Sequence, residues 1–233
     1  MTRIARIVVP RAPHHVTQRA NRHEALFLGP DDYALYRDGL AESCLRFGVA
    51  VWAYCLMPDY VHLILTSSDP AGLALALSRA HRLYAGYFNA RARQTGHVFQ
   101  GRFGSVEMDE DHLMAAARYV ALNPVRARLT ERARDWPHSS VRAHLAGCDD
   151  ALVEVRPLLE RASRFADLIE GEADEAAFTA LRRSEAIGRP LGSPEFLQAV
   201  ARRLGRVVTP AKRGRKPKGA AGGGRRLKVR RGG

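Results

Sequence analysis

Two apolar segments joined by a Pro-Asp turn signal constrain the fold of this chain more than any other feature. Residues 49–57 (VAVWAYCLM) are almost continuously apolar, as in a central strand that is buried on both faces. Residues 60–66 (YVHLILT) are rich in β-branched and aromatic side chains and follow directly after Pro58 and Asp59. Together the two segments predict a β-hairpin in the middle of a sheet.

The flanking sequence predicts the rest of a small α+β domain. The expected elements are a strand at 14–20, a helix at 31–47, a helix at 71–93, a strand at 98–108 and a helix from 109 to 124. Asp31 or Asp32 can cap the first of these helices. With the hairpin, the first six elements read β-α-β-β-α-β, the split βαβ or ferredoxin-like arrangement. The predicted fold is an antiparallel sheet with helices on one face.

Charge divides the chain into three segments. Residues 1–145 carry 18 Arg against 13 acidic residues, and residues 146–201 carry 6 Arg against 11. Residues 202–233 carry 13 basic residues and no acidic one. We expect a ferredoxin-like domain over 1–145, a helical extension with a GRPLGS element over 146–206, and a disordered basic tail over 207–233. Ser193 is the expected N-cap of a helix in the extension, with Pro194 at its first position.

Composition excludes several classes of protein. With 46% hydrophobic residues the chain can bury a core. No apolar run reaches the roughly 18 residues of a membrane span, and the N-terminal apolar stretch is too short for a signal peptide. The three Cys lack CxxC spacing, which argues against a zinc knuckle or a disulfide framework. We therefore expect a cytoplasmic, nucleoid-associated protein, with a nucleic acid as partner of the basic tail and no membrane.

Two local patterns carry candidate reactive side chains. In MPDYVHLIL (57–65), strand alternation places Tyr60 and His62 on one face and Asp59 on the other. In ARYVALNPVRA (117–127), Tyr119 and Asn123 are four residues apart and share a helix face. A tyrosine can act as a nucleophile, and an amide oxygen can bind a hard cation. Taken alone, each pattern is more typical of an ordinary structural histidine or an ordinary amphipathic helix.

Basic stretches form a third pattern, comprising FQGRFGS (99–105), GRPLGS (188–193) and KRGRKPK (212–218). Arginine beside glycine suits contacts to phosphate and insertion into a narrow groove. A solvated surface and a solubilising tail are the alternative interpretation. If the protein binds DNA, the expected contact residues are Arg102, Arg189, Arg213 and Arg215 from these stretches, with Arg118 and Arg126 from the 117–127 pattern.

The patterns taken together resemble a known family. The hairpin motif, VFQGRF, RYVALNPVRA, WPHSS (136–140) and GRPLGSPEF occur in the order typical of the single-tyrosine HUH transposases, and within them of the REP-associated tyrosine transposases. The resemblance runs from about residue 6 to residue 218. It implies a ferredoxin-like core that binds single-stranded or hairpin DNA. It also implies that Tyr119 attacks the scissile phosphate, forming a 5′-phosphotyrosine link and releasing a 3′-hydroxyl.

The resemblance further implies a Mg²⁺ or Mn²⁺ ion held by the two histidines of an H-x-H strand and by a polar residue one helix turn after the tyrosine. His62 and Asn123 match two of these positions, but Tyr60 stands where the family has its first histidine. A neutral phenol is a poor ligand for a hard divalent ion. His15 on the first strand can face the same site and substitute. Asp59 has suitable oxygen chemistry but points away unless the turn bends.

Three interpretations of function follow. The first is a transposase that nicks and rejoins DNA through Tyr119, with Tyr60 as a less favoured second nucleophile. The second, motivated by Tyr60, is a catalytically weakened, domesticated protein that binds structured repeat DNA. The third, a metal-dependent phosphodiesterase, needs more acidic ligands than the motifs contain. The resemblance leaves both a homodimer and a monomer open.

Overall fold

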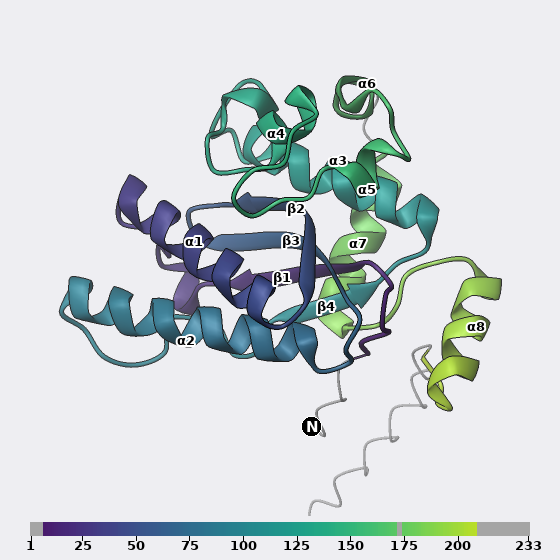
Figure 1. The fold of residues 1–233 in the computed structure, drawn as a ribbon, viewed down its shortest axis with the longest axis horizontal. Coiled ribbons are helices and arrows are strands. Elements are labelled where there is room, and N and C mark those ends of the chain that lie inside the picture. The colour runs from purple at the N-terminus through teal and green to yellow at the C-terminus, as the bar shows by residue number, and fades with distance from the viewer. Residues whose placement is uncertain (1–6, 172–173, 209–233) are drawn as a thin grey trace, which may run out of the picture.

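The computed structural model describes residues 7–171 and 174–208 and builds them around a four-stranded antiparallel sheet (Figure 1). The strands are β1 (His14–Arg19), β2 (Val49–Leu56), β3 (Tyr60–Ser67) and β4 (Gly104–Glu107), in the spatial order β2-β3-β1-β4. The predicted hairpin is formed by β2 and β3, and β1 pairs with both β3 and β4. The prediction of a central strand at 49–57 is wrong: β2 is an edge strand, and its apolar residues are buried because both faces are packed and the WPHSS stretch covers its outer side. The α+β class and the ferredoxin-like arrangement are confirmed.

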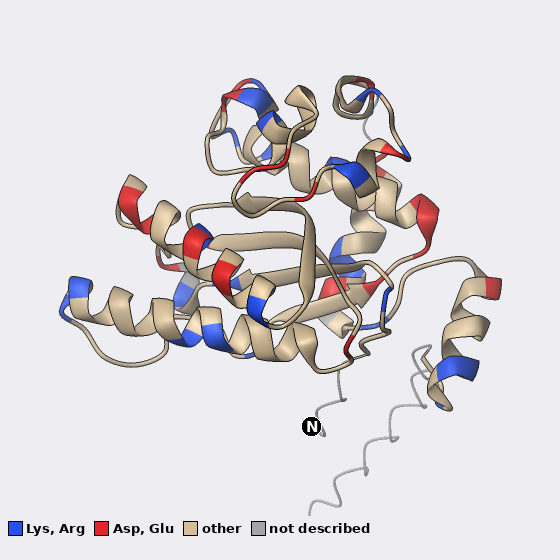
Figure 2. Cartoon of the chain, in the orientation of Figure 1, with Lys and Arg blue, Asp and Glu red and all other residues tan. Residues whose placement is uncertain are grey.

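Two connecting helices, α1 (Pro30–Arg46) and α2 (Gly72–Ala92), pack side by side against one face of the sheet (Figure 1). Their apolar residues recur at helical spacing and meet the sheet in one core, as with Leu40 of α1 and Leu77 of α2, both fully buried. In Figure 2 the charged residues of α2 are all basic, whereas α1 carries both acidic and basic residues. Arg79 of α2 pairs with Glu42 of α1 at 2.6 Å.

The opposite face is covered by α3 (Glu110–Arg126), on which α7 (Glu175–Ile187) packs. Phe178 and Leu181 of α7 are fully buried in the same core as Val120 of α3 and Ile64 of β3. Helices therefore lie on both faces of the sheet, because α3, within residues 1–145, already covers the second face and α7 of the extension packs onto it. The remaining helices are η1 (Asn21–His23), η2 (Ala133–Asp135), α4 (Val141–Ala146), α5 (Arg156–Leu159), α6 (Phe165–Glu170) and α8 (Pro194–Leu204).

Several boundaries differ from the sequence-based prediction. The last strand covers only Gly104–Glu107 instead of 98–108, because Gly101 adopts a left-handed φ of 70° that ends regular pairing. The N-cap of α1 is Gly29, whereas the buried carboxylate of Asp32 accepts a hydrogen bond from the Leu28 N–H at 2.6 Å. Within the expected helical extension, the described residues between 150 and 187 form three separate helices, α5, α6 and α7.

The end of α3 and the start of α8 also bear on the site. α3 continues through Pro124 to Arg126, so Asn123 lies inside the helix and not at its end. The predicted cap of α8 is confirmed, since Ser193 Oγ accepts from the Phe196 N–H at 3.2 Å and Pro194 is the first helical residue.

The WPHSS stretch covers the free edge of β2. The Leu56 N–H donates to the His138 carbonyl at 2.8 Å, and the Ser140 N–H donates to the Tyr54 carbonyl at 3.0 Å. The Trp136 indole N–H adds a bond to the Leu56 carbonyl at 3.1 Å. An uncovered edge strand would offer these groups to another chain, so the motif has a structural function here.

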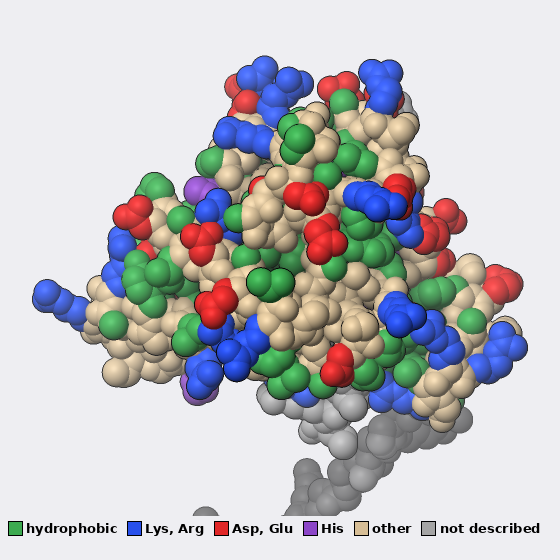
Figure 3. All heavy atoms as spheres, viewed as in Figure 1, with side chains coloured by type: hydrophobic (Ala, Val, Ile, Leu, Met, Phe, Trp, Pro, Cys, Tyr) green, Lys and Arg blue, Asp and Glu red, His purple; other side chains and the backbone are tan. Residues whose placement is uncertain are grey.

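The surface seen in Figure 3 mixes basic, acidic and apolar side chains and shows no extended field of one sign. This agrees with the balance of charge over residues 1–201, where 24 Arg face 24 acidic residues. Over 7–171 and 174–208, no helix has the length and apolar character needed to cross a bilayer.

Candidate active site

Tyr119 lies in the third turn of α3 and faces the sheet. The helix begins at Asp109, whose carboxylate accepts a hydrogen bond from the His112 N–H at 3.0 Å. Only 6% of Tyr119 is exposed, and its ring makes edge contacts with His62, His15 and Phe178 at centroid distances of 5.6, 6.0 and 5.2 Å. Burial raises the pKa of the Tyr119 hydroxyl, and the nearby guanidinium groups of Arg182 and Arg126 act in the opposite direction.

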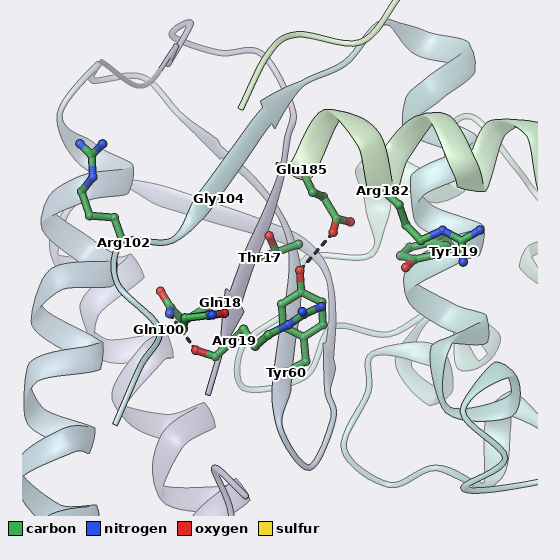
Figure 4. Close-up of a pocket in the computed structure, with 10 residues that line it drawn as sticks. All are labelled: Thr17, Gln18, Arg19, Tyr60, Gln100, Arg102, Gly104, Tyr119, Arg182 and Glu185. Atoms are coloured by element: carbon green, nitrogen blue, oxygen red, sulfur yellow. Dashed lines mark hydrogen bonds between the residues drawn. The ribbon is translucent and has the colours of Figure 1, made fainter. Parts of the chain in front are cut away.

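A cavity of about 470 Å³ opens beside Tyr119 (Figure 4). Three guanidinium groups from separate parts of the chain line it: Arg19 at the end of β1, Arg102 before β4, and Arg182 on α7. Tyr60 and Glu185 complete the wall next to Tyr119. Three arginine side chains can bind a phosphodiester in this cavity, where the tyrosine hydroxyl at the wall can contact it.

Two buried imidazoles lie next to the tyrosine. Nε2 of His15 is 3.3 Å from Nδ1 of His62, and the rings stack at 5.5 Å with an interplanar angle of 13°. His15 is fully buried and His62 is 2% exposed. Burial lowers the pKa of His15 to about 4 and lowers that of His62 well below its ordinary range. Both rings are therefore neutral at pH 7 and keep lone pairs for ligation or hydrogen bonding.

Glu185 of α7 extends this cluster. Its Oε1 lies 3.4 Å from Nδ1 of His15, and its Oε2 accepts a hydrogen bond from the Tyr60 hydroxyl at 3.0 Å (Figure 4). Burial raises the pKa of the Glu185 carboxyl to about 7. One ligand atom each from His15, His62 and Glu185 lies within 4.8 Å of the other two. Two imidazoles and a carboxylate are a donor set that divalent ions accept.

Tyr60 contacts the cluster as a hydrogen-bond donor. Its ring meets His62 at 4.3 Å, and the guanidinium of Arg19 lies 4.5 Å from its centroid on the other side. Burial and the neighbouring Glu185 raise the pKa of its hydroxyl, so the phenol is neutral at pH 7.

The other two candidate ligands differ in position. Asn123 is 8% exposed, and its Nδ2 is buried with no hydrogen-bond partner in the described part of the chain. Asp59 lies in the β2–β3 turn, where its carbonyl accepts a hydrogen bond from the Ala20 N–H at 2.8 Å. The charge of its carboxylate contributes to the raised pKa of Tyr33. It is not part of the His15, His62 and Glu185 group. The turn does not bend to bring Asp59 into that group.

The predicted DNA-contacting arginines are only partly gathered at the site. Arg102 lines the cavity, and Arg126 lies 5.9 Å from the Tyr119 centroid while pairing with Glu175. Arg118 stands beside Gly171 and is absent from the cavity wall, because its side chain leaves α3 on another side. Arg189 donates to the Val207 carbonyl at 3.1 Å. Arg213 and Arg215 lie outside the described residues.

The sequence-based list missed Arg19, Arg182 and Glu185. Strand alternation contains a signal for Arg19, since it shares a face with His15 and Thr17. Arg182 and Glu185 are three residues apart on one helix face, but no local pattern links that helix to Tyr119.

Comparison with known proteins finds a family that this chain resembles. The model of the family described as IS200-like transposase matches residues 9–123. A Haemophilus influenzae protein that carries the name REP-associated tyrosine transposase is 26% identical over 117 residues, 45% of this chain and 66% of its own length. The chain thus matches just under two thirds of that relative.

A solved structure of a REP-associated tyrosine transposase bound to a REP hairpin shares the fold with a TM-score of 0.55. The two are 17% identical, and the likeness covers 66% of this chain and 93% of the other. Over residues 9–123, the chain is similar to the IS200-like transposase family.

Proposed function

We propose that the protein nicks and rejoins single-stranded or hairpin DNA, with Tyr119 as the nucleophile. The observation that carries this is the position of Tyr119 at the wall of a cavity with three arginines, beside two buried neutral imidazoles. The substrate class is supported by the REP hairpin held by the structural neighbour.

In the proposed reaction, the Tyr119 hydroxyl oxygen attacks the scissile phosphorus. A bond forms between that oxygen and phosphorus, and the bond from phosphorus to the 3′ oxygen breaks. The phenol proton is lost to solvent, and the departing 3′ oxygen takes up a proton to become a 3′-hydroxyl. The DNA 5′ end then remains on Tyr119 as a phosphodiester, which the reverse attack by a 3′-hydroxyl can rejoin.

The arginines position the DNA and stabilise charge. Arg182 and Arg126 both favour ionisation of Tyr119, against the effect of its burial. Arg19 and Arg102 lie on other sides of the cavity, where each can bind a backbone phosphate (Figure 4). The cavity thus holds a strand while α3 presents the nucleophile.

The site fits a divalent ion such as Mg²⁺ or Mn²⁺. His15 Nδ1 is buried without a hydrogen bond, and both imidazoles are neutral donors. His62 and His15 would hold the ion, and Asn123 is the family position for a further ligand. When bound, the ion would polarise the scissile phosphate and offset its developing charge.

A labelled REP-like hairpin tests the proposal. With Mn²⁺ present, the full chain should form a covalent adduct that resists denaturation, and Tyr119→Phe should abolish it. Tyr33→Phe is the matched control, because Tyr33 lies on α1 away from the cavity. Equal adduct yields for the wild type and Tyr119→Phe would rule out Tyr119 as the nucleophile.

Tyr60 favours a second candidate, a hairpin-binding protein with weakened cleavage. In that case the wild type binds the hairpin but forms almost no adduct, and Tyr60→His raises both metal affinity and cleavage. Strong wild-type cleavage that Tyr60→His does not increase would contradict this alternative.

A further inference from the structure

Helix α7 lies outside the region matched by the family model, yet its side chains enter the cluster beside Tyr119. We propose that Glu185 of α7 is a ligand of the divalent ion, together with His15 and His62, and that Tyr60 holds Glu185 in place. This inference rests on the proposed function, since it assigns the ligands of the ion used at the same site.

The spacing of the three side chains fits one ion. Their ligand atoms all lie within 4.8 Å of one another. Oxygen and nitrogen ligands of divalent ions lie about 2.0–2.6 Å from the metal, so ligands on opposite sides of an ion are about 4–5 Å apart. Little rearrangement would be needed for these atoms to surround a cation.

The hydrogen bonding of the cluster leaves donor atoms unsatisfied. His15 Nδ1 and Glu185 Oε1 are both buried, and neither has a hydrogen-bond partner in the described part of the chain, although they are 3.4 Å apart. Buried polar atoms without partners are rare and unfavourable. A cation between the two atoms would satisfy both.

Tyr60 has a separate contribution. Its hydroxyl donates to Oε2 of Glu185 at 3.0 Å, which leaves Oε1 directed at His15. Figure 4 shows the two side chains joined in this way at the wall of the cavity. Outer hydrogen bonds of this kind fix the orientation of metal-binding carboxylates. The residue that replaces the usual histidine is therefore a positioning residue, and a carboxylate from α7 replaces the lost imidazole.

Hydrophobic packing fixes α7 in the position from which Glu185 reaches His15. Phe178 and Leu181 are fully buried and anchor the helix against α3, with the Phe178 ring 5.2 Å from that of Tyr119. Gly104 lets β4 lie close to the Thr17 side chain and to α7. A Cβ at this position would lie 2.8 Å from Thr17 Oγ1 and 3.8 Å from the Glu185 carbonyl oxygen. One helix thus presents both Glu185 and Arg182 to the cavity.

Titration of the full chain with Mn²⁺ in the absence of DNA, read by the loss of the free-ion electron paramagnetic resonance signal, tests the ligand. Glu185→Gln should raise the Kd at least tenfold, on the order of the losses seen when metal-site groups are removed. Glu175→Gln removes the same charge from the same helix and should leave the Kd within about twofold. Equal affinity for Glu185→Gln and Glu175→Gln overturns the proposal.

Two further variants separate position from fold. Tyr60→Phe removes only the hydroxyl, and we expect a Kd raised about tenfold with an unchanged melting temperature. Wild-type affinity in Tyr60→Phe overturns its positioning role. If Glu185→Gln fails to fold, Glu185→Asp keeps the charge but withdraws the oxygens by one methylene, and wild-type affinity in that variant overturns the ligand assignment.

Tyr119→Phe in the same titration distinguishes this inference from the proposed function. We expect it to bind Mn²⁺ like the wild type while forming no adduct. If Glu185→Gln binds normally and Tyr119→Phe still abolishes the adduct, only the ligand assignment fails. If Tyr119→Phe retains the adduct, the proposed function fails even where Glu185→Gln has lost the metal.

Discussion

The surroundings of Tyr119 act on its ionisation in two directions. Burial and Glu185 raise the pKa of its hydroxyl, whereas Arg182, Arg126 and Arg19 lower it. A cation bound to Glu185 would offset its charge and so remove one of the two effects that raise the pKa of Tyr119. In the proposed site, metal binding and nucleophile activation are therefore coupled through one carboxylate.

Glu107 illustrates a buried acid outside the candidate site. It is 1% exposed, both of its carboxylate oxygens lack hydrogen bonds in the described part of the chain, and burial raises its pKa to about 7 against the opposing charge of Arg203. Across the sheet, His14 donates to the Ala12 carbonyl and accepts from the Val9 N–H, so it is neutral and offers Glu107 no charge.

The raised pKa predicts a stability that falls with pH. The folded state retains the Glu107 proton to about pH 7, whereas the unfolded chain releases it near 4.5. Between these values the folded state binds more protons, so the free energy of unfolding declines as pH rises, by roughly 1–3 kcal/mol. Glu107→Gln should remove this decline. We expect its stability relative to the wild type to increase from pH 5 to pH 8 in urea unfolding.

Glu131→Gln provides the control for Glu107, because Glu131 is exposed. Its difference from the wild type should stay constant over the same pH range. A constant difference for Glu107→Gln as well would mean that Glu107 ionises in the folded state as it does in the unfolded chain.

At the level of helices and strands, sequence periodicity predicted most of the sheet and the histidine, tyrosine and asparagine side chains that β1, β3 and α3 contribute to the site. Alternation along β1 and β3 placed His15 and His62 on the same face, and the register makes them diagonal neighbours, since His62 pairs with Thr17. Helical spacing likewise paired Tyr119 with Asn123. These predictions needed only local geometry.

The missed elements depend on contacts between distant parts of the chain. Glu185 reaches His15 because α7 packs on α3, a contact that the amphipathic pattern of α7 permits but does not specify. β4 is shorter than its apolar pattern indicated because the backbone turns at Gly101. Local periodicity specifies which face of an element is buried, but not which other element covers it.

The covered edge of β2 yields a prediction for Ser140. Its Oγ accepts from the Tyr54 N–H at 3.0 Å and lies 3.3 Å from the Tyr54 carbonyl, and the residue is 3% exposed. Ser140→Ala leaves these buried groups without a side-chain partner and should lower the free energy of unfolding by about 1–2 kcal/mol. Ser78→Ala, at an exposed position on α2, should change it by less than about 0.5 kcal/mol in the same denaturation experiment. Equal effects of the two variants would show that this contact adds no stability.

On the scale of the whole molecule, both outer strands of the sheet are covered. β2 is bonded by the WPHSS stretch, and β4 is bonded by Leu191, whose N–H donates to the Glu107 carbonyl at 2.8 Å. A second copy could not extend the sheet through either strand without displacing these segments. Extension of the sheet is therefore not the expected mode of self-association, and the cluster of His15, His62 and Glu185 lies within one chain.

The distribution of charge assigns non-specific attraction and chemistry to different parts of the chain. Residues 1–201 carry equal numbers of basic and acidic groups, whereas residues 202–233 hold 13 basic groups and no acid. All candidate reactive side chains lie within the described residues. Removing residues 210–233 should therefore weaken hairpin binding and flatten its salt dependence, while the adduct still forms at saturating DNA. The log–log slope of affinity against salt should lose about 0.7 for each single-strand phosphate that the tail contacts.

Fluorescence anisotropy of a labelled hairpin at several salt concentrations measures this slope. A full-length variant in which the Lys and Arg residues of 210–233 are replaced by Gln separates charge from chain length, and it should behave like the truncated protein. If the truncated protein keeps the wild-type slope, the arginines of the cavity and not the tail account for the salt dependence. If the Gln variant keeps that slope while the truncation loses it, the charge of the tail is not the source of the salt dependence. Only the expected pair of results places the sequence-independent attraction in the 10 basic groups of residues 210–233.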